Sequence, residues 1–368
     1  MRRQIHAVLA IGAAGMMALT ACGSSDEDYA AGALSSRPRV GVILPDSVSS
    51  PRWETADRPL LKAAFDKAGI DAEIQSAAED VSKFQTIADG MISEGVKAML
   101  IVNLDSDSGS AVIKKARKAG IPVIDYDRLT LGGGAQYYVS FDNVAVGREI
   151  GKGLVKCLKE SGKKPADGGV VTLNGAPTDS NAAMFRTGYV QAIRAAGYRI
   201  VADQSVPDWD PIRGGTIFQQ IDTRRHGQYI GVAAANDGLG GAVVARLKTL
   251  GQAGKIPVTG QDAGDEGLQR LLLGTQCVSV YKSNKLEAEA AVKLASSLIK
   301  GDRAAADALA TDRVRDDKTK KNVKSVLLRP EPIFKNNVKD VITDGATTAD
   351  RVCTTAALKA ACSAQGIS

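Results

Sequence analysis

Two stretches of the same design decide how this chain folds: Gly120-Ile-Pro-Val-Ile-Asp-Tyr-Asp127 and Lys255-Ile-Pro-Val-Thr-Gly-Gln-Asp262. Aligned on their Ile-Pro-Val triplets, both end in an aspartate at the same position. Each stretch closes a unit in which an apolar strand, at 98–102 or 229–234, leads through an amphipathic helix to a second strand. A strand–helix–strand unit that occurs twice predicts two similar α/β lobes.

An earlier pair of such segments also repeats, at residues 40–75 and 170–204. These units build open parallel sheets, in which ligands bind beyond the carboxyl ends of the strands. We therefore expect Asp127 and Asp262 to face one cleft from opposite walls. The predicted fold class is α/β, with two Rossmann-like lobes joined by a hinge of several strands and a ligand cleft between them.

The order of the elements also predicts the domain boundaries. We assign residues 37–141 and about 283–328 to the N-terminal lobe, and residues 142–282 and about 329–368 to the C-terminal lobe and its tail. A chain of 368 residues is long enough for two cores. The net charge of +6 is modest, and no Lys/Arg stripe is interleaved with aromatic residues. We therefore expect no nucleic-acid partner.

The N-terminus reads as a secretory signal peptide over residues 1–21. A basic start precedes an apolar run that is too short for an ordinary transmembrane helix. The ending Leu19-Thr20-Ala21-Cys22 is similar to a bacterial lipobox, so we expect Cys22 to be lipidated. Residues 22–36 then form a flexible tether. Several acyl chains anchor a domain stably, which predicts an extracytoplasmic protein held at the membrane.

Four cysteines follow Cys22: Cys157, Cys277, Cys353 and Cys362. Export permits disulfides, and four thiols allow three full pairings. Proximity in sequence favours a bond between Cys353 and Cys362, whereas Cys157 and Cys277 either pair or stay as buried thiols. Their spacing does not match a metal site, and we expect neither a metal nor a cofactor.

The motifs of common catalytic sites are missing from the sequence. The only histidine after the signal peptide is His226, in a basic loop, and no G-x-S-x-G, H-E-x-x-H or P-loop pattern occurs. Asp127 and Asp262 could instead form the carboxylate pair of a glycosidase. Nearby Arg128 and Lys282 would lower a carboxylate pKa, which disfavours a general acid. We predict that the chain is not an enzyme.

The strand ends supply a mixed polar and aromatic set instead. A pyranose presents hydroxyls that donate and accept hydrogen bonds, together with apolar C–H faces on which indole rings stack. Any one of these residues could simply cap a helix or form a surface ion pair, but the set gathers at corresponding ends of repeated units. The candidate ligand-binding residues are Arg52, Trp53, Asp127, Arg128, Asp179, Asn181, Trp209, Asn236, Asp262 and Lys282.

The sequence resembles the type I periplasmic sugar-binding proteins of ABC importers, and within that family most of all the members that bind D-xylose. The resemblance spans residues 39–339. It rests on Arg52-Trp53, Ala119-Gly-Ile-Pro-Val, Tyr126-Asp-Arg128, Tyr138-Val-Ser-Phe-Asp-Asn143, Pro177-x-Asp179-x-Asn181, Phe185-Arg186, Asp208-Trp209, Asn236-Asp237, Gly260-Gln-Asp262-Ala263, Gly274-Thr-Gln and Val280-Tyr-Lys282.

The resemblance implies that the polar candidates hydrogen-bond a pentose while the two tryptophans pack against it. It leaves Asp127 either as a contact or as the residue that orients Arg128, and Arg186 as a brace of its loop. Two departures from the family pattern stand out. One residue too many separates Arg52 from Arg58, next to an unusual loop at 45–51, and the cysteine-bearing C-terminal tail is extra.

The predicted function is that of a substrate-binding lipoprotein, monomeric, that captures a monosaccharide, D-xylose first, and delivers it to an ABC permease and its ATPase. One alternative keeps the fold and makes the chain a sugar sensor for a membrane kinase or chemoreceptor. The glycosidase is the enzyme alternative. A transcriptional regulator of the same fold is disfavoured, because the sequence carries an export signal and lacks DNA-binding helices.

Overall fold

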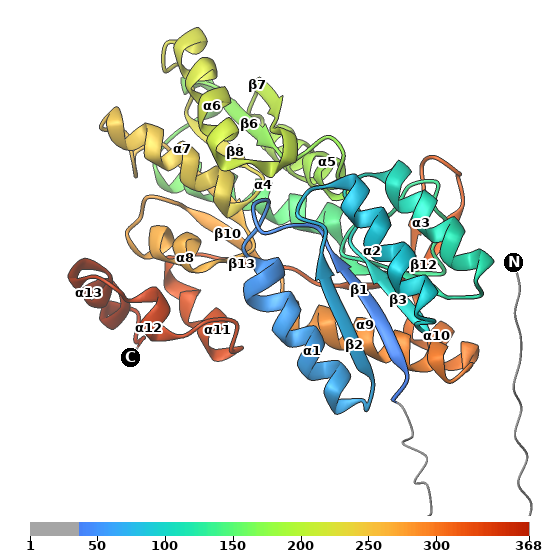
Figure 1. Ribbon diagram of the computed structural model, residues 1–368. Coiled ribbons are helices and arrows are strands. Elements are labelled where there is room, and N and C mark those ends of the chain that lie inside the picture. Colours follow the sequence, from blue (N-terminus) through green and yellow to red (C-terminus); the bar gives the residue numbers. More distant parts are fainter. Residues whose placement is uncertain (1–36, 368) are drawn as a thin grey trace, which may run out of the picture. The chain divides into compact units, whose positions relative to one another are not determined.

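The computed structural model of the protein describes residues 37–367. The signal peptide, Cys22 and the tether lie outside these residues, so the predictions for them stand as made. Two groups of mainly parallel strands, each with helices packed on it, form an α/β architecture as expected (Figure 1). Across residues 37–367, every helix is too short or too polar to cross a membrane.

The first sheet has seven strands, and all but β11 run parallel to their neighbours. In spatial order they are β11 (Asp312–Arg315), β12 (Asn322–Leu328), β5 (Tyr137–Phe141), β4 (Val123–Tyr126), β3 (Ala98–Ile101), β1 (Arg39–Leu44) and β2 (Asp71–Ser76). The central strands are apolar because helices cover both faces. One face packs on α1 (Arg58–Lys67), α9 (Asn284–Ile299) and α10 (Arg303–Leu309), and the other on α2 (Val81–Ser93) and α3 (Ser106–Lys118).

The second group of strands is built in two parts that a single bridge between Val232 and Val258 connects. The parts are β7 (Ile200–Ser205), β6 (Val170–Asn174) and β8 (Gly231–Ala234), then β9 (Thr259–Gln261), β10 (Val278–Tyr281) and β13 (Glu331–Ile333). The helices that follow or cover these strands are α4 (Asn143–Glu160), α5 (Ser180–Ala195), α6 (Pro211–Arg225), α7 (Asp237–Thr249) and α8 (Asp265–Leu272). Two short 3-10 turns complete this part, η2 (Pro165–Asp167) and η3 (Pro207–Trp209).

The chain passes between the two groups of strands at three places: after β5, after β10 and after β12. Three crossings agree with the expected hinge of several strands. The domain boundaries proposed from the sequence place their divisions at the same three points, and they remain an interpretation of this topology.

The repeated turns occupy equivalent positions in the two sheets. The amide of Asp127 donates to Val139 O at 2.8 Å, and the amide of Asp262 donates to Val280 O at 2.9 Å, in each case on the neighbouring strand. Both aspartates also have positive φ, 61° and 93°. The structure therefore contains the internal repeat that the Ile-Pro-Val triplets predict.

A π-helical turn replaces the start of the first helix. The sequence predicts one helix over 56–68, but η1 (Trp53–Asp57) is a π turn that leads into α1. A π turn holds one residue more than an α-helical turn and is frequent at functional sites. It thus accommodates the extra residue between Arg52 and Arg58.

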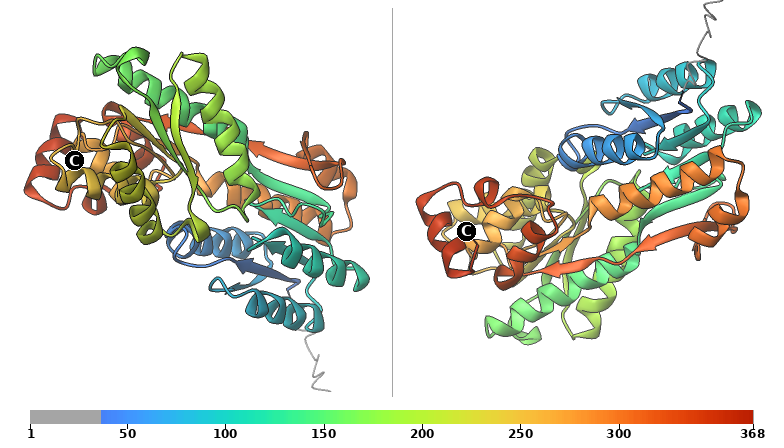
Figure 2. Two further views of the ribbon diagram at one scale, coloured as in Figure 1. Left: turned by 90° about the horizontal axis from the view of Figure 1, so that it is seen from above. Right: turned by 90° about the horizontal axis from the view of Figure 1, so that it is seen from below.

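The C-terminal tail folds into η4 (Lys335–Asn337), α11 (Val338–Thr343), α12 (Ala349–Val352) and α13 (Ala356–Ala364). The expected disulfide between Cys353 and Cys362 joins the last two helices. A second disulfide links Cys157 of α4 to Cys277, which settles a pairing that the sequence left open. In both views of Figure 2 the red tail lies beside the gold segment that contains α8.

Candidate functional site

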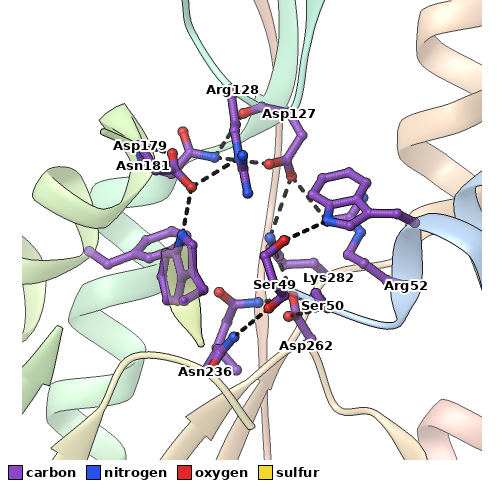
Figure 3. A pocket seen from close by; sticks show the side chains of 14 residues that line it. Ser49, Ser50, Arg52, Asp127, Arg128, Asp179, Asn181, Asn236, Asp262 and Lys282 are labelled. Carbon is purple, nitrogen blue, oxygen red and sulfur yellow. Dashed lines mark hydrogen bonds and ion pairs between the residues drawn. The ribbon is translucent and has the colours of Figure 1, made fainter. Parts of the chain in front are cut away.

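One cavity collects all ten candidate residues. The space between its walls that atoms do not fill is about 320 Å³, part of which is open to solvent. Its walls come from the loops that follow β1, β4, β6, β7, β8, β9 and β10 (Figure 3). Four further side chains line it: Ser49, Ser50, Phe185 and Gln261.

Arg52 stands at the base of one wall inside a cage of carboxylates. Its guanidinium donates to Asp57 at 2.7 and 2.8 Å, to Asp127 at 3.0 Å and to Glu287 at 2.6 Å. These bonds use four of the five N–H groups that an arginine carries. Burial would lower the pKa of Arg52, but the three carboxylates outweigh it and raise that pKa. The cage fixes Arg52 and leaves one donor for a ligand.

Asp57 and Glu287 were not predicted, and both are fully buried beneath the pocket. Asp57 also accepts a hydrogen bond from Tyr126 Oη at 2.6 Å. Burial, together with the charges of Asp127 and Asp57, raises the pKa of Glu287 to about 8 despite the nearby arginine. Neither residue lies at a strand end, so the pattern that found the other residues could not find these two.

Asp127 contacts one cation from each wall. Its Oδ2 lies 3.0 Å from Arg52 and 3.5 Å from Lys282 Nζ, and Oδ1 accepts from Asn181 at 3.1 Å. Burial would raise the pKa of Asp127, but the charges of Lys282, Arg52 and Arg128 hold it below its ordinary value. This carboxylate is therefore ionised, as the argument against a general acid requires.

Arg128 and Asp179 connect the wall to the start of α5. Arg128 Nε lies 3.0 Å from Asp179 Oδ2, so Asp179, and not Asp127, supplies the ion pair that orients Arg128. Asp179 also caps α5 by accepting from Asn181 N at 2.8 Å, and it accepts from Trp209 Nε1 at 3.1 Å. Burial and the nearby Asp127 raise its pKa, against the opposing charge of Arg128.

On the opposite wall, the polar groups of Lys282 and Asp262 make fewer and longer contacts within the protein. Lys282 Nζ lies 3.5 Å from both Asp127 Oδ2 and Asp262 Oδ1, too far for strong hydrogen bonds. Asp262 accepts from Ser50 Oγ at 3.2 Å and is also bonded to Gln261. Burial would lower the pKa of Lys282, but Asp127 and Asp262 raise it. A charged ammonium with spare donors and a carboxylate with spare lone pairs thus face the cavity.

Two tryptophans give the cavity its apolar surfaces. Trp53 lies under the Arg52 guanidinium at 4.5 Å and donates from Nε1 to Ser49 Oγ at 3.2 Å. Trp209 lies against the backbone of Gly175. A Cβ added at Gly175 would come within 2.0 Å of the indole, so only glycine leaves room for the ring. Both indoles are nearly buried. Each wall thus contributes one fixed aromatic ring.

The two walls contact each other directly across the cavity. Asn236 Nδ2 donates to Ser49 O at 3.3 Å, and Ser180 Oγ donates to Leu129 O at 3.0 Å. Asn181 Nδ2 donates to the backbone oxygen of Asp127 at 2.8 Å. The described conformation is therefore a closed one.

Arg186, which the resemblance also matched, lies outside the cavity. It pairs with Asp203 on β7, which also accepts from Thr172 and Asn174. Through Asp203 it braces β7, whose end carries the η3 loop, whereas the sequence places it as a brace of the loop before its own helix. Among residues 37–367, no cluster of three or more His, Cys, Asp or Glu side chains could hold a metal ion.

The four cavity residues absent from the sequence prediction had a local signal. Gln261 immediately precedes Asp262, Ser49 and Ser50 belong to the unusual loop before Arg52, and Phe185 lies one turn after Asn181. Each lies within four residues of a predicted site residue. Extending the selection to neighbours on the same turn would have found them.

Comparisons with known proteins place these observations in context. The periplasmic binding protein domain matches residues 40–303 of this chain. The D-xylose-binding periplasmic protein of Escherichia coli is 31% identical over 83% of this chain and 90% of its own length. The D-xylose-binding periplasmic protein of Haemophilus influenzae is 30% identical over 85% and 92%.

A solved structure gives the same result for the fold. The ABC transporter solute-binding protein of Clostridium phytofermentans, crystallised with bound β-D-glucose, superposes with a TM-score of 0.77 at 25% identity. The match covers 85% of this chain and 99% of that one.

Proposed function

We propose that this chain, which belongs to the periplasmic binding protein family, captures a monosaccharide in the cavity described above and delivers it to an ABC permease and its ATPase. Family membership answers the enzyme question, because the relatives are transport proteins: the chain is a binding protein and not a glycosidase. The sensor alternative remains a prediction that no residue of the site favours.

The observation that carries the proposal is the balance of groups lining the cavity. Three cations, Arg52, Arg128 and Lys282, face three carboxylates, Asp127, Asp179 and Asp262, between two indoles. A charged ligand would upset this balance, whereas the hydroxyls of a neutral sugar can accept from the cations and donate to the carboxylates. The indoles suit the C–H faces of a pyranose ring.

D-xylose is the sugar we propose first. The two curated relatives are named for it, and the solved relative holds β-D-glucose. These two pyranoses share the orientation of their hydroxyls at C2, C3 and C4 and differ by the hydroxymethyl group on C5 of glucose. Selectivity between them therefore depends on whether a wall packs against C5, and the two sugars form the natural test pair.

Binding would act by stabilising the closed conformation. A sugar that touches Asp127 and Arg128 on one side and Asp262 and Asn236 on the other makes both sets of contacts only when the walls are together. The ligand therefore shifts an open–closed equilibrium toward the closed form, which is the form presented to the permease.

The location proposed is outside the cytoplasmic membrane, with the chain held by a lipid on Cys22 and acting as a monomer. Replacing Cys22 with alanine should move the protein from the membrane fraction to the soluble extracytoplasmic fraction. If the variant stays with the membrane to the same extent as the unmodified sequence, the lipid anchor is wrong while the sugar site is unaffected.

The experiment for the binding function is a fluorescence titration of the chain from Gly23 onward. Trp53 and Trp209 are its only tryptophans and both line the cavity. We expect a saturable response to D-xylose with a Kd of about 1 μM, near −8 kcal/mol, and a weaker response to D-glucose. A response to glucose alone would contradict xylose, and silence toward D-ribose, L-arabinose and D-galactose as well, checked by calorimetry, would contradict the function.

A further inference from the structure

The C-terminal tail contacts the two chain segments that carry Lys282 and Asp262. Its helices α11 to α13 bury apolar side chains against α8, among them Val341, Val352 and Leu358 against Leu268 and Leu271. The family match ends at residue 303, so this tail lies beyond it. Burial of the apolar face of α8 accounts for this packing. It does not account for the hydrogen bonds that the tail also makes to the segments around Lys282 and Asp262.

Asp344, at the end of α11, holds the crossing that bears Lys282. Its Oδ2 accepts from Tyr281 Oη at 2.5 Å and from Ser283 Oγ at 2.9 Å. These are the residues immediately before and after Lys282. A single carboxylate oxygen thus pins both neighbours of a cavity lysine at the point where the chain passes from β10 to α9.

A second set of bonds joins the tail to the turn that bears Asp262. Asp265, the first residue of α8, accepts from Thr347 Oγ1 at 2.5 Å and from Arg351 Nε at 2.8 Å. Asp265 lies three residues after Asp262, whose backbone φ is 93°. The tail therefore also supports a turn that a non-glycine residue rarely adopts.

We propose that the tail is a splint for the ligand site, with Asp344 as a positioning residue that sets the place of Lys282 relative to Asp262. Lys282 Nζ lies 3.5 Å from Asp262 Oδ1, and the tail bridges the segments on which both sit. The effect that this inference predicts on affinity rests on the proposed sugar-binding function. The splint does not touch the ligand, and it acts through backbone placement.

The test compares Asp344→Ala, Asp344→Asn and the matched control Asp340→Ala. Asp340 lies on the same helix, is exposed, and its carboxylate makes no bond within residues 37–367. Asp344→Ala should weaken D-xylose binding by about 3- to 10-fold through the loss of two hydrogen bonds. Asparagine keeps an acceptor oxygen, so Asp344→Asn should restore most of the affinity, and Asp340→Ala should bind like the original protein.

Hydrogen exchange gives a readout that needs no sugar. In Asp344→Ala we expect faster amide exchange at residues 262–265 and 281–284, with residues 126–130 unchanged. If the tail of this variant fails to fold, the double variant Tyr281→Phe with Ser283→Ala removes the same bonds from the other side and should give the same pattern.

The outcomes separate the splint from the function. Unchanged affinity and unchanged exchange in Asp344→Ala would overturn the splint while the sugar site stands. If the original protein binds no sugar, the proposed function is wrong and amide hydrogen exchange alone tests the splint. Faster exchange in Asp344→Ala that is confined to residues 262–265 and 281–284 supports the splint. Faster exchange throughout the protein, or no change in exchange, overturns it.

Discussion

The turns of Asp127 and Asp262 share a backbone but differ in what lies beneath them. In the first, Asp125 is buried two residues earlier on β4 and accepts from Thr130 N and Oγ1 at 2.8 and 2.7 Å. The aligned position in the second is Gly260, where a Cβ would come within 2.0 Å of Asp237 Oδ1. The carboxylate in that space comes from α7 instead.

Asp237 does the work of Asp125 from a different element. It accepts from Gly264 N at 3.0 Å and from Gln276 Nε2 at 2.7 Å. In both turns a buried carboxylate therefore binds an amide of the loop just after the cavity aspartate. The two turns therefore share a backbone conformation and a buried carboxylate that accepts from the loop. They differ in the element that supplies this carboxylate, which is β4 in the first turn and α7 in the second.

The two cavity aspartates also differ in their partners. Asp127 is fixed by Arg52, Lys282 and Asn181, and its side chain is 4% exposed. Asp262 lies at the same distance from Lys282 and accepts from Ser50 and Gln261, but within residues 37–367 it contacts no arginine, and it is 16% exposed. We infer that the first aspartate maintains the charge network of its wall, while the second keeps its capacity for the ligand.

The largest effect expected is that of Asp127→Ala on stability. Breaking a buried ion pair costs about 3–5 kcal/mol, and this change removes one of the carboxylates that Arg52 and Lys282 each contact. Urea unfolding should show this loss, together with loss of sugar binding. The control Asp127→Asn keeps an acceptor for Asn181 and should lose less. A stability change below about 1 kcal/mol in Asp127→Ala would show that its wall does not depend on this carboxylate.

Asp262→Ala should weaken binding without much change in folding. Removing a charged acceptor from a ligand costs about 1.5–3 kcal/mol, or roughly 10- to 150-fold in Kd. Calorimetry with D-xylose measures the affinity and a urea melt the stability. Near-normal affinity would remove Asp262 from the site, and a stability loss equal to that of Asp127→Ala would erase the contrast between the two turns.

Gly175→Ala should disturb Trp209 and leave Trp53 in place. The added methyl group would overlap the indole, so the ring must move away from its place in the cavity wall and its contact with the sugar is lost. Gly215→Ala is the matched control, because its Cβ would meet only Ala242 at 3.7 Å. Fluorescence titration should show a lower affinity for Gly175→Ala alone. Equal affinities would mean that Trp209 does not pack on the ligand.

The buried carboxylates beneath the turns predict a pH dependence of stability. Burial raises the pKa of Asp125 to about 7 and that of Asp237 to about 6, although their hydrogen bonds act in the opposite direction. Both values exceed the unfolded value of about 4. The folded state thus holds these protons more tightly, and the stability they contribute is present below pH 4 and lost as pH rises through 6 and 7.

Unfolding free energies measured from pH 4 to pH 8 check this dependence. Asp125→Asn should remove part of the decline up to about pH 7, and Asp237→Asn part of the decline up to about pH 6, since asparagine does not titrate. Parallel curves for the original protein and both variants would show that neither carboxylate titrates in this range.

The sequence predicted the parts of the molecule that local pattern determines. Repeated strand–helix–strand units indicated two lobes, and polar and aromatic residues near strand ends identified ten side chains that line one cavity. This worked because parallel strands bring their carboxyl ends to one edge. Asp127 and Asp262 could therefore be paired without any knowledge of the packing.

The remainder depends on contacts between distant segments. Glu287 reaches Arg52 across 235 residues of sequence, and Asp237 fills the space at Gly260 only because α7 packs closely on that strand. The helices of the tail are short, and apolar periodicity is weak in so few residues. Their place beside Lys282 follows from packing on α8, which the sequence pattern alone does not reveal.

The most direct measurement is a crystal structure of the chain from Gly23 onward with D-xylose. We predict a single pyranose in the cavity between Trp53 and Trp209, with hydroxyls within hydrogen-bond distance of Asp262, Lys282 and Arg128. The aspartates of the two repeated turns would then serve one ligand. A sugar bound elsewhere, or a cavity whose walls stay apart with the sugar on one side alone, would contradict the account.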